Sequence, residues 1–139
     1  MSTNSTIAKK NSDGSITAIY CHWDGYISHN GKILLEHYTD EAKIDELLAL
    51  GSLSVLGESI GEKVDFDTFT NMKADPTQCL AYGRDRGEKN VSQKIFKTEG
   101  RYEAYAQQSY NYLFENGHWT VNGELLSSDV IKAAMGVLD

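Results

Sequence analysis

The stretch that decides the fold reads Ser15-Ile16-Thr17-Ala18-Ile19-Tyr20-Cys21-His22-Trp23. It is rich in β-branched and aromatic residues, which favour β-strands. Alternation along a strand gives the stretch two faces, one with Ile16, Ala18, Tyr20 and His22 and the other with Thr17, Ile19, Cys21 and Trp23. Neither face is cleanly polar, so the sequence predicts a strand that is covered on both sides.

Turn dipeptides place the other strands. Asp13-Gly14 precedes the first stretch and makes it the second arm of a hairpin, with Ile7 and Ala8 as candidates for the first arm. A second hairpin is predicted from residues 109–114 and 118–121, joined across Asn116-Gly117. Two further strands are expected over residues 79–82 and 91–98.

Helical spacing and capping residues indicate the helices. Residues 32–38 are expected to form a short helix, and Thr39 to cap a second one that ends at Gly51. Ser127 or Ser128 caps a C-terminal helix, whereas the spacing over residues 102–114 fits helix and strand about equally. Because strands and helices alternate without a βαβ rhythm, we predict an α+β fold: a small antiparallel sheet with two or three helices packed on it.

Length and charge narrow the class of protein. A chain of 139 residues is the usual size of one domain, so we expect a single domain over residues 1–139, with residues 1–6 able to fray. The 20 acidic residues outnumber the 13 basic ones, a net charge of −7 that argues against non-specific nucleic-acid binding and suits docking onto a basic surface. Without a signal peptide or an apolar run of the ~20 residues that span a bilayer, we expect a cytosolic protein with no membrane contact.

The standard chemical templates are missing from the sequence. No dinucleotide, phosphate-loop or nucleophile-elbow motif occurs, and Cys21 and Cys79 are not in a CxxC pair. We therefore expect two reduced cysteines, no metal site and no cofactor. A tyrosine-rich stretch, with Tyr102, Tyr105, Tyr110 and Tyr112, fits core packing and an interface equally well, which leaves a homodimer open.

The first candidate site is the aromatic segment, residues 20–26, which reads Tyr20-Cys21-His22-Trp23-Asp24-Gly25-Tyr26. In an extended chain His22 and Asp24 lie on one side, where the carboxylate could orient the imidazole as a base or both could hold a metal. Cys21 points the opposite way, so it makes a poor nucleophile for that base. The alternative is a buried aromatic strand that ends in an Asp-Gly turn.

The second candidate site is the arginine segment, residues 84–88, which reads Arg84-Asp85-Arg86-Gly87-Glu88. Two guanidinium groups on a glycine-bounded turn could hold a phosphate or a carboxylate. They could equally form ion pairs with Asp85, Glu88 and the acidic surface. The segment therefore predicts either a ligand or partner contact, or a structural ion-pair network.

Several motifs resemble a family of small proteins from phages, prophages and plasmids. The aromatic segment carries the resemblance, together with the opening residues, Leu34-Leu35-Glu36-His37-Tyr38 and the arginine segment, over roughly residues 1–90. Family members carry a proline and an arginine where this chain has Ile27 and Asn4. The resemblance implies an accessory protein of a mobile element that acts in the host cytosol, and it supplies no catalytic residues.

Two functional hypotheses follow. The preferred one is a non-enzymatic inhibitor that binds a host defence component, such as a CRISPR nuclease, through its acidic surface with Arg84 and Arg86 as anchors. The alternative is a nucleotide or small-molecule binder, a sponge or a minor hydrolase, in which the arginines hold phosphate and His22, Trp23 and Tyr26 contact a base or sugar. A structural factor of a phage particle remains a third possibility.

Overall fold

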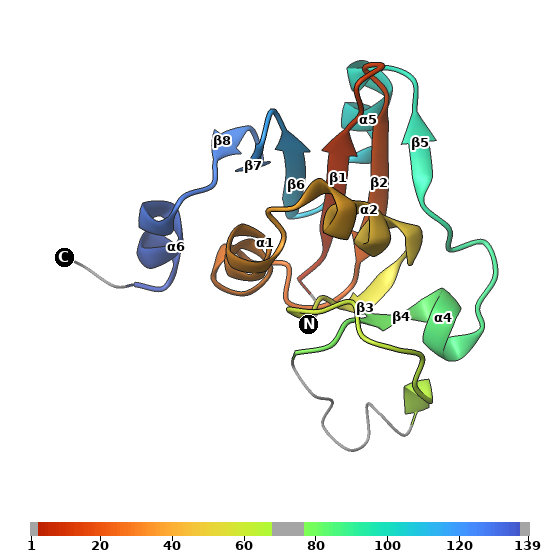
Figure 1. Ribbon diagram of the computed structural model, residues 1–139. Coiled ribbons are helices and arrows are strands. Elements are labelled where there is room, and N and C mark those ends of the chain that lie inside the picture. Colours follow the sequence, from red (N-terminus) through yellow and green to blue (C-terminus); the bar gives the residue numbers. More distant parts are fainter. Residues whose placement is uncertain (1–2, 68–76, 137–139) are drawn as a thin grey trace.

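The computed structural model describes residues 3–67 and 77–136. Its strands form one mixed sheet in the order β4-β3-β2-β1-β6-β7-β8, with β5 also pairing with β2 (Figure 1). The strands are β1 (Ser5–Lys10), β2 (Ile16–Cys21), β3 (Leu53–Val55), β4 (Leu80–Ala81), β5 (Lys94–Phe96), β6 (Tyr110–Glu115), β7 (His118–Val121) and β8 (Glu124–Leu125). The helices are the π-helical turn η1 (Ile27–Gly31) and α1 (Lys32–His37), α2 (Glu41–Ala49), α4 (Tyr82–Arg86), α5 (Glu99–Tyr105) and α6 (Ser128–Ala134).

The α+β class and both predicted hairpins are confirmed. β1 and β2 pair antiparallel around Asp13-Gly14, and β6 and β7 pair antiparallel around Asn116-Gly117, where both residues have positive φ. The sheet is not purely antiparallel, because β1 runs parallel to β6 and β2 runs parallel to β3. These parallel pairs join segments that are far apart in the chain. They could not be predicted from turn dipeptides, because parallel strands are not connected by a tight turn.

Three expectations about single elements are corrected, and the open alternative over residues 102–114 is decided with the predicted strand at 109–114 confirmed. Ser5 and Thr6 are not frayed, since both are buried in β1 between β2 and β6. Asp40, not Thr39, caps α2, because its carboxylate accepts a hydrogen bond from the Ala42 amide at 3.1 Å. Residues 102–114 divide into the end of α5 and the strand β6. The predicted turn at 83–88 is the short helix α4, and the described residues contain more helices than the expected two or three.

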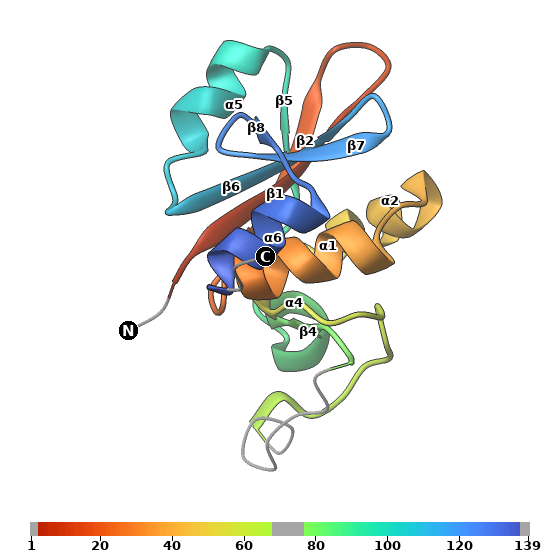
Figure 2. The same cartoon turned by 90° about the vertical axis from the view of Figure 1, so that its left-hand side faces the viewer.

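Both faces of the sheet are covered, as the alternation in β2 predicts. Ile19 and Cys21 belong to the main core, to which α1, α2 and α6 contribute. Ile16 and Ala18 belong to a smaller core beneath α5, built around Tyr102. Figure 2 shows α5 and the α1–α6 pair on opposite sides of the strands.

Trp119 ties the β6–β7 hairpin to the main core. Its ring is fully buried and packs edge-on against Phe114, with the ring centroids 5.2 Å apart. Its indole N–H donates to the Tyr38 carbonyl at 2.9 Å, just beyond the end of α1. The Tyr38 hydroxyl in turn donates to the Gly57 carbonyl at 2.7 Å. One polar chain inside the core thus connects three segments that are distant in the sequence.

We expect Trp119→Phe to lower the free energy of unfolding by about 2–3 kcal/mol, because the smaller ring leaves a cavity and the Tyr38 carbonyl loses its donor. Urea denaturation followed by circular dichroism measures the change. The matched control is Trp23→Phe at the other, exposed tryptophan, which should alter stability by no more than about 0.5 kcal/mol. Equal effects of the two substitutions would contradict the packing described for Trp119.

Candidate functional site

The backbone of the aromatic segment is held from three sides. After β2 ends, the amides of His22 and Trp23 donate to carbonyls of the β3 segment at 3.0 Å each. The Gly25 amide donates to the Thr3 carbonyl at 2.8 Å, and the Gly25 carbonyl accepts from the buried Tyr112 hydroxyl at 2.7 Å. A Cβ at position 25 would lie 2.9 Å from the Thr3 oxygen, which is too close for any other residue to fit without a shift. These contacts therefore hold the backbone of the aromatic segment in one position, and this backbone is the platform for its exposed side chains.

Two large aromatic side chains project from this platform. Trp23 is 41% exposed and Tyr26 is 39% exposed. Trp23 meets the His22 ring edge-on at a centroid distance of 4.7 Å, and the Tyr26 hydroxyl donates to the Asp24 carboxylate at 3.0 Å. Both rings are thus oriented by neighbours while keeping an open face toward solvent.

The structure does not bring His22 and Asp24 together as a base pair. A 2.7 Å hydrogen bond joins His22 Nδ1 to the Tyr20 hydroxyl, whereas Asp24 accepts from Tyr26. Asp24 also has a positive φ of 56°, so the chain is not extended where the two-residue spacing was applied. The structural alternative holds only in part, because β2 ends at Cys21 and the chain then bends with Trp23 and Tyr26 exposed, not buried in a strand.

Both cysteines are free and fully enclosed. Burial raises the pKa of the Cys21 thiol to about 12, although Asn30 donates a hydrogen bond to its sulfur. Burial also raises the pKa of Cys79, whose sulfur lies 3.4 Å from the Tyr38 hydroxyl. A thiol with a raised pKa is a weak nucleophile at neutral pH.

Arg84 and Asp85 form an internal clamp. The Asp85 side chain has no exposed surface, and its two oxygens accept from the Val64 amide at 3.0 Å and the Ala81 amide at 2.8 Å. The Arg84 guanidinium donates to both carboxylate oxygens, from Nε at 3.0 Å and from Nη2 at 3.2 Å. It also donates to the carbonyls of Ile60, Gly61 and Cys79. The alternative of a structural ion-pair network therefore describes Arg84 and Asp85. The guanidinium nitrogens of Arg84 that could bind a phosphate already donate to protein acceptors.

Arg86 and Glu88 differ from this clamp because they lie at the surface. The Arg86 side chain is 53% exposed, rests over the Phe66 ring and approaches the Glu88 carboxylate at 3.5 Å. In the described residues no hydrogen bond, ion pair or ring contact links the arginine segment to the aromatic segment.

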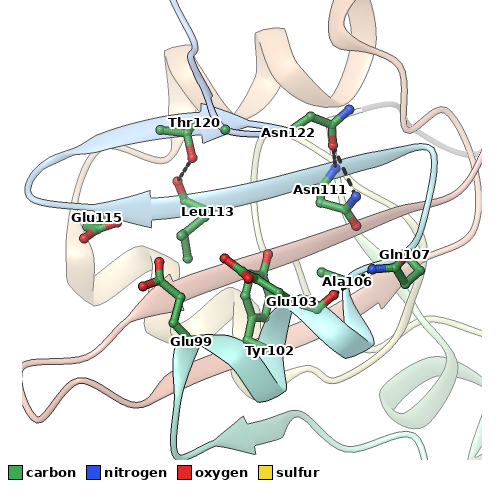
Figure 3. Close-up of a pocket in the computed structure, with 11 residues that line it drawn as sticks. Glu99, Tyr102, Glu103, Ala106, Gln107, Asn111, Leu113, Glu115, Thr120 and Asn122 are labelled. Atoms are coloured by element: carbon green, nitrogen blue, oxygen red, sulfur yellow. Dashed lines mark hydrogen bonds between the residues drawn. The ribbon is translucent and has the colours of Figure 1, made fainter.

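A groove that sequence reasoning missed lies between α5 and the β6–β7 hairpin (Figure 3). It has a volume of about 510 Å³. On the helix side it is lined by Glu99, Tyr102 and Glu103, and on the β6 side by Asn111, Leu113 and Glu115. The strand side is predicted from residues 109–114, and a helix predicted over residues 99–105 would have placed Glu99, Tyr102 and Glu103 on one helix face.

The groove is acidic. Figure 3 shows Glu99 and Glu103 reaching from α5 toward β6, with Leu113 pointing back toward the helix. Lys10 donates to Glu115 at 3.2 Å, and this hydrogen bond, together with the charges of Glu115 and Glu99, raises the pKa of Lys10. Glu99 and Glu103 form no ion pair with residues 3–67 or 77–136. Of the three carboxylates that line the groove, only that of Glu115 is paired with an ammonium group among the described residues.

Neither a metal cluster nor a membrane span is found in the part of the chain that the structure describes. Its His, Cys, Asp and Glu side chains nowhere gather in a group of three or more that could hold a metal ion. None of its helices has the length and apolar character needed to cross a bilayer. Comparison of the chain with protein-family models, curated proteins and solved structures gives no match.

We expect Arg84→Ala to lower the free energy of unfolding by about 3 kcal/mol or more, because it leaves the buried Asp85 carboxylate without its counter-charge. Arg84→Lys, which keeps the charge but loses the two-pronged contact, should fall between this variant and the wild type. Arg86→Ala is the matched control and should cost about 1 kcal/mol or less. Thermal and urea denaturation measure all three. A larger loss for Arg86→Ala than for Arg84→Ala would refute the clamp.

The two thiols should not react with Ellman's reagent in the folded protein, because the reagent needs an accessible thiolate. Cys21 has a pKa of about 12, so raising the pH from 7 to 9 should leave its thiol unreactive. In 8 M urea both cysteines should react. Fast labelling of the native protein at pH 8 would show that at least one thiol is reachable.

Proposed function

We propose that this protein is a non-enzymatic binding protein of a mobile element, and that it inhibits a host protein or ribonucleoprotein defence complex by occupying its surface. Trp23 and Tyr26 are the anchors of the contact. The observation that carries the proposal is the exposure of both rings, 41% and 39%, on a backbone that Thr3 and Tyr112 hold in place.

Exposed aromatic residues on a rigid segment are suited to protein recognition. Tryptophan and tyrosine are enriched among the residues that dominate interface energies. Because the neighbouring backbone is already ordered, binding loses little conformational entropy there. The contacts of Trp23 with His22 and of Tyr26 with Asp24 pre-orient the rings in the same way.

The net charge of −7 favours a partner with a basic surface, such as a nucleic-acid channel. Of the two arginines, only Arg86 has a side chain open enough to reach a partner, since Arg84 belongs to the clamp with Asp85. The resemblance to proteins of phages and plasmids supports a host defence component as the target. The resemblance supports the kind of target only through the context in which similar proteins occur. The exposed rings and the net charge support a protein partner with a basic surface.

We expect a tagged wild-type protein to retain a stoichiometric protein partner from host lysate, and Trp23→Ala/Tyr26→Ala to weaken that retention about tenfold or more. Leu125→Ala/Ile95→Ala is the matched control, because it removes two other exposed apolar side chains. In defended cells, the wild type but not the anchor variant should restore infection.

Loss of the partner in the control variant, or its full retention by the anchor variant, would refute these anchors. A protein that captures nothing and leaves defended cells protected would refute the inhibitor itself. A thermal-shift panel of nucleotides then tests the small-molecule alternative, for which ligand at 100 times its dissociation constant adds about 2.7 kcal/mol of stability.

A further inference from the structure

The groove between α5 and the β6–β7 hairpin lies on the face of the sheet that α5 covers. α5 covers the second face over β1 and β2, where Tyr102 packs with Ala8, Ile16 and Ala18. Beyond Tyr102, Leu113 is only half-buried and looks into the groove. The groove is therefore open to solvent, has a volume of about 510 Å³, and has Tyr102 and Leu113 among its mostly polar lining residues.

We infer that this groove is the docking site for a basic peptide segment of a protein partner, with an arginine or lysine side chain seated between α5 and β6. The inference deepens the proposed function and rests on it for the existence of a partner. It uses a surface that shares no residue with Trp23 and Tyr26.

Charge complementarity selects this occupant. Glu99 and Glu103 on one wall and Glu115 on the other outnumber the one ammonium of Lys10. Glu99 and Glu103 are exposed, so each attracts a cation only weakly in water, but the attractions of several carboxylates for one cation in the groove add. An anionic or purely apolar partner would leave Glu99 and Glu103 without compensation.

The apolar residues of the groove fit the aliphatic stem of an arginine or lysine side chain. Long cationic side chains lay an aliphatic stem on apolar surface while the charged head meets its counter-charge. Tyr102 and Leu113 provide that surface between the carboxylates. The amides at the far end serve the fold, since Asn111 bonds Thr6, Gln108 and Asn122. The charged groups of the groove without an ion pair among the described residues are therefore the carboxylates of Glu99 and Glu103.

Lys10 shows which ligand the groove attracts. Its ammonium already sits 3.2 Å from Glu115, drawn by the charges of Glu115 and Glu99. It competes with an incoming cation for these carboxylates. Removing it should strengthen binding, which is the opposite of what the loss of a partner-contacting residue would do.

The test is a fluorescence-anisotropy titration of the full-length protein with a labelled alternating Gly-Arg octapeptide at low salt. We expect Glu99→Gln/Glu103→Gln to weaken binding about tenfold and Lys10→Gln to strengthen it about threefold. The charge-matched control is Glu46→Gln/Glu62→Gln, which removes two exposed carboxylates elsewhere and should change the affinity less than twofold. Circular dichroism checks that each variant is folded.

An equal loss of peptide affinity in the control variant would contradict binding at the groove, because binding would then reflect only the net charge. So would an unchanged affinity for Glu99→Gln/Glu103→Gln, a weaker affinity for Lys10→Gln, or no binding by the wild type at low salt. A Gly-Glu octapeptide that binds as well as Gly-Arg would also overturn it. Because the titration contains no host component, its failure leaves the Trp23 and Tyr26 anchors standing, whereas a pull-down without any partner leaves the titration unaffected.

Discussion

The structure depends on the position of β1 at the centre of the sheet. β1 pairs antiparallel with β2, its neighbour in the sequence, and parallel with β6, about a hundred residues later, so that Ile7 lies opposite both Ile19 and Tyr112. A parallel partner cannot follow through a tight turn, and the intervening chain must cross over the sheet. That crossing brings α5 onto the second face, and the space it leaves beside β6 is the acidic groove.

Buried polar contacts then fix the loops around this sheet. Each joins a side-chain donor to a backbone carbonyl in another segment: Tyr112 to Gly25, Tyr38 to Gly57, Trp119 to Tyr38, and Arg84 to Ile60. A buried polar group without a partner costs folding free energy, so these pairings are constraints on where the loops can lie. They explain why the unusual residues of the sequence are divided between the interior and the surface.

Within each motif, this division separates structural from functional roles. In the aromatic segment, Cys21 and Gly25 are enclosed while Trp23 and Tyr26 face solvent. In the arginine segment, Asp85 is enclosed and Arg84 serves it, while Arg86 and Glu88 remain outside. Composition alone cannot tell which of two arginines placed two residues apart is structural. The difference is that Arg84, and not Arg86, donates to the carbonyls of Ile60, Gly61 and Cys79.

The sequence by itself determined the local elements. The turns at Asp13-Gly14 and Asn116-Gly117, the two covered faces of β2, and the N-cap of the C-terminal helix depend on residues a few positions apart, whose conformational preferences act locally. Only the tertiary structure decided the parallel pairing of β1 with β6, the burial of Asp85, the turn that separates His22 from Asp24, and the groove between Glu103 and Glu115. Most of these depend on which distant segments meet, and the turn depends on how they hold Gly25. Those choices come from packing of the whole chain, not from any short pattern.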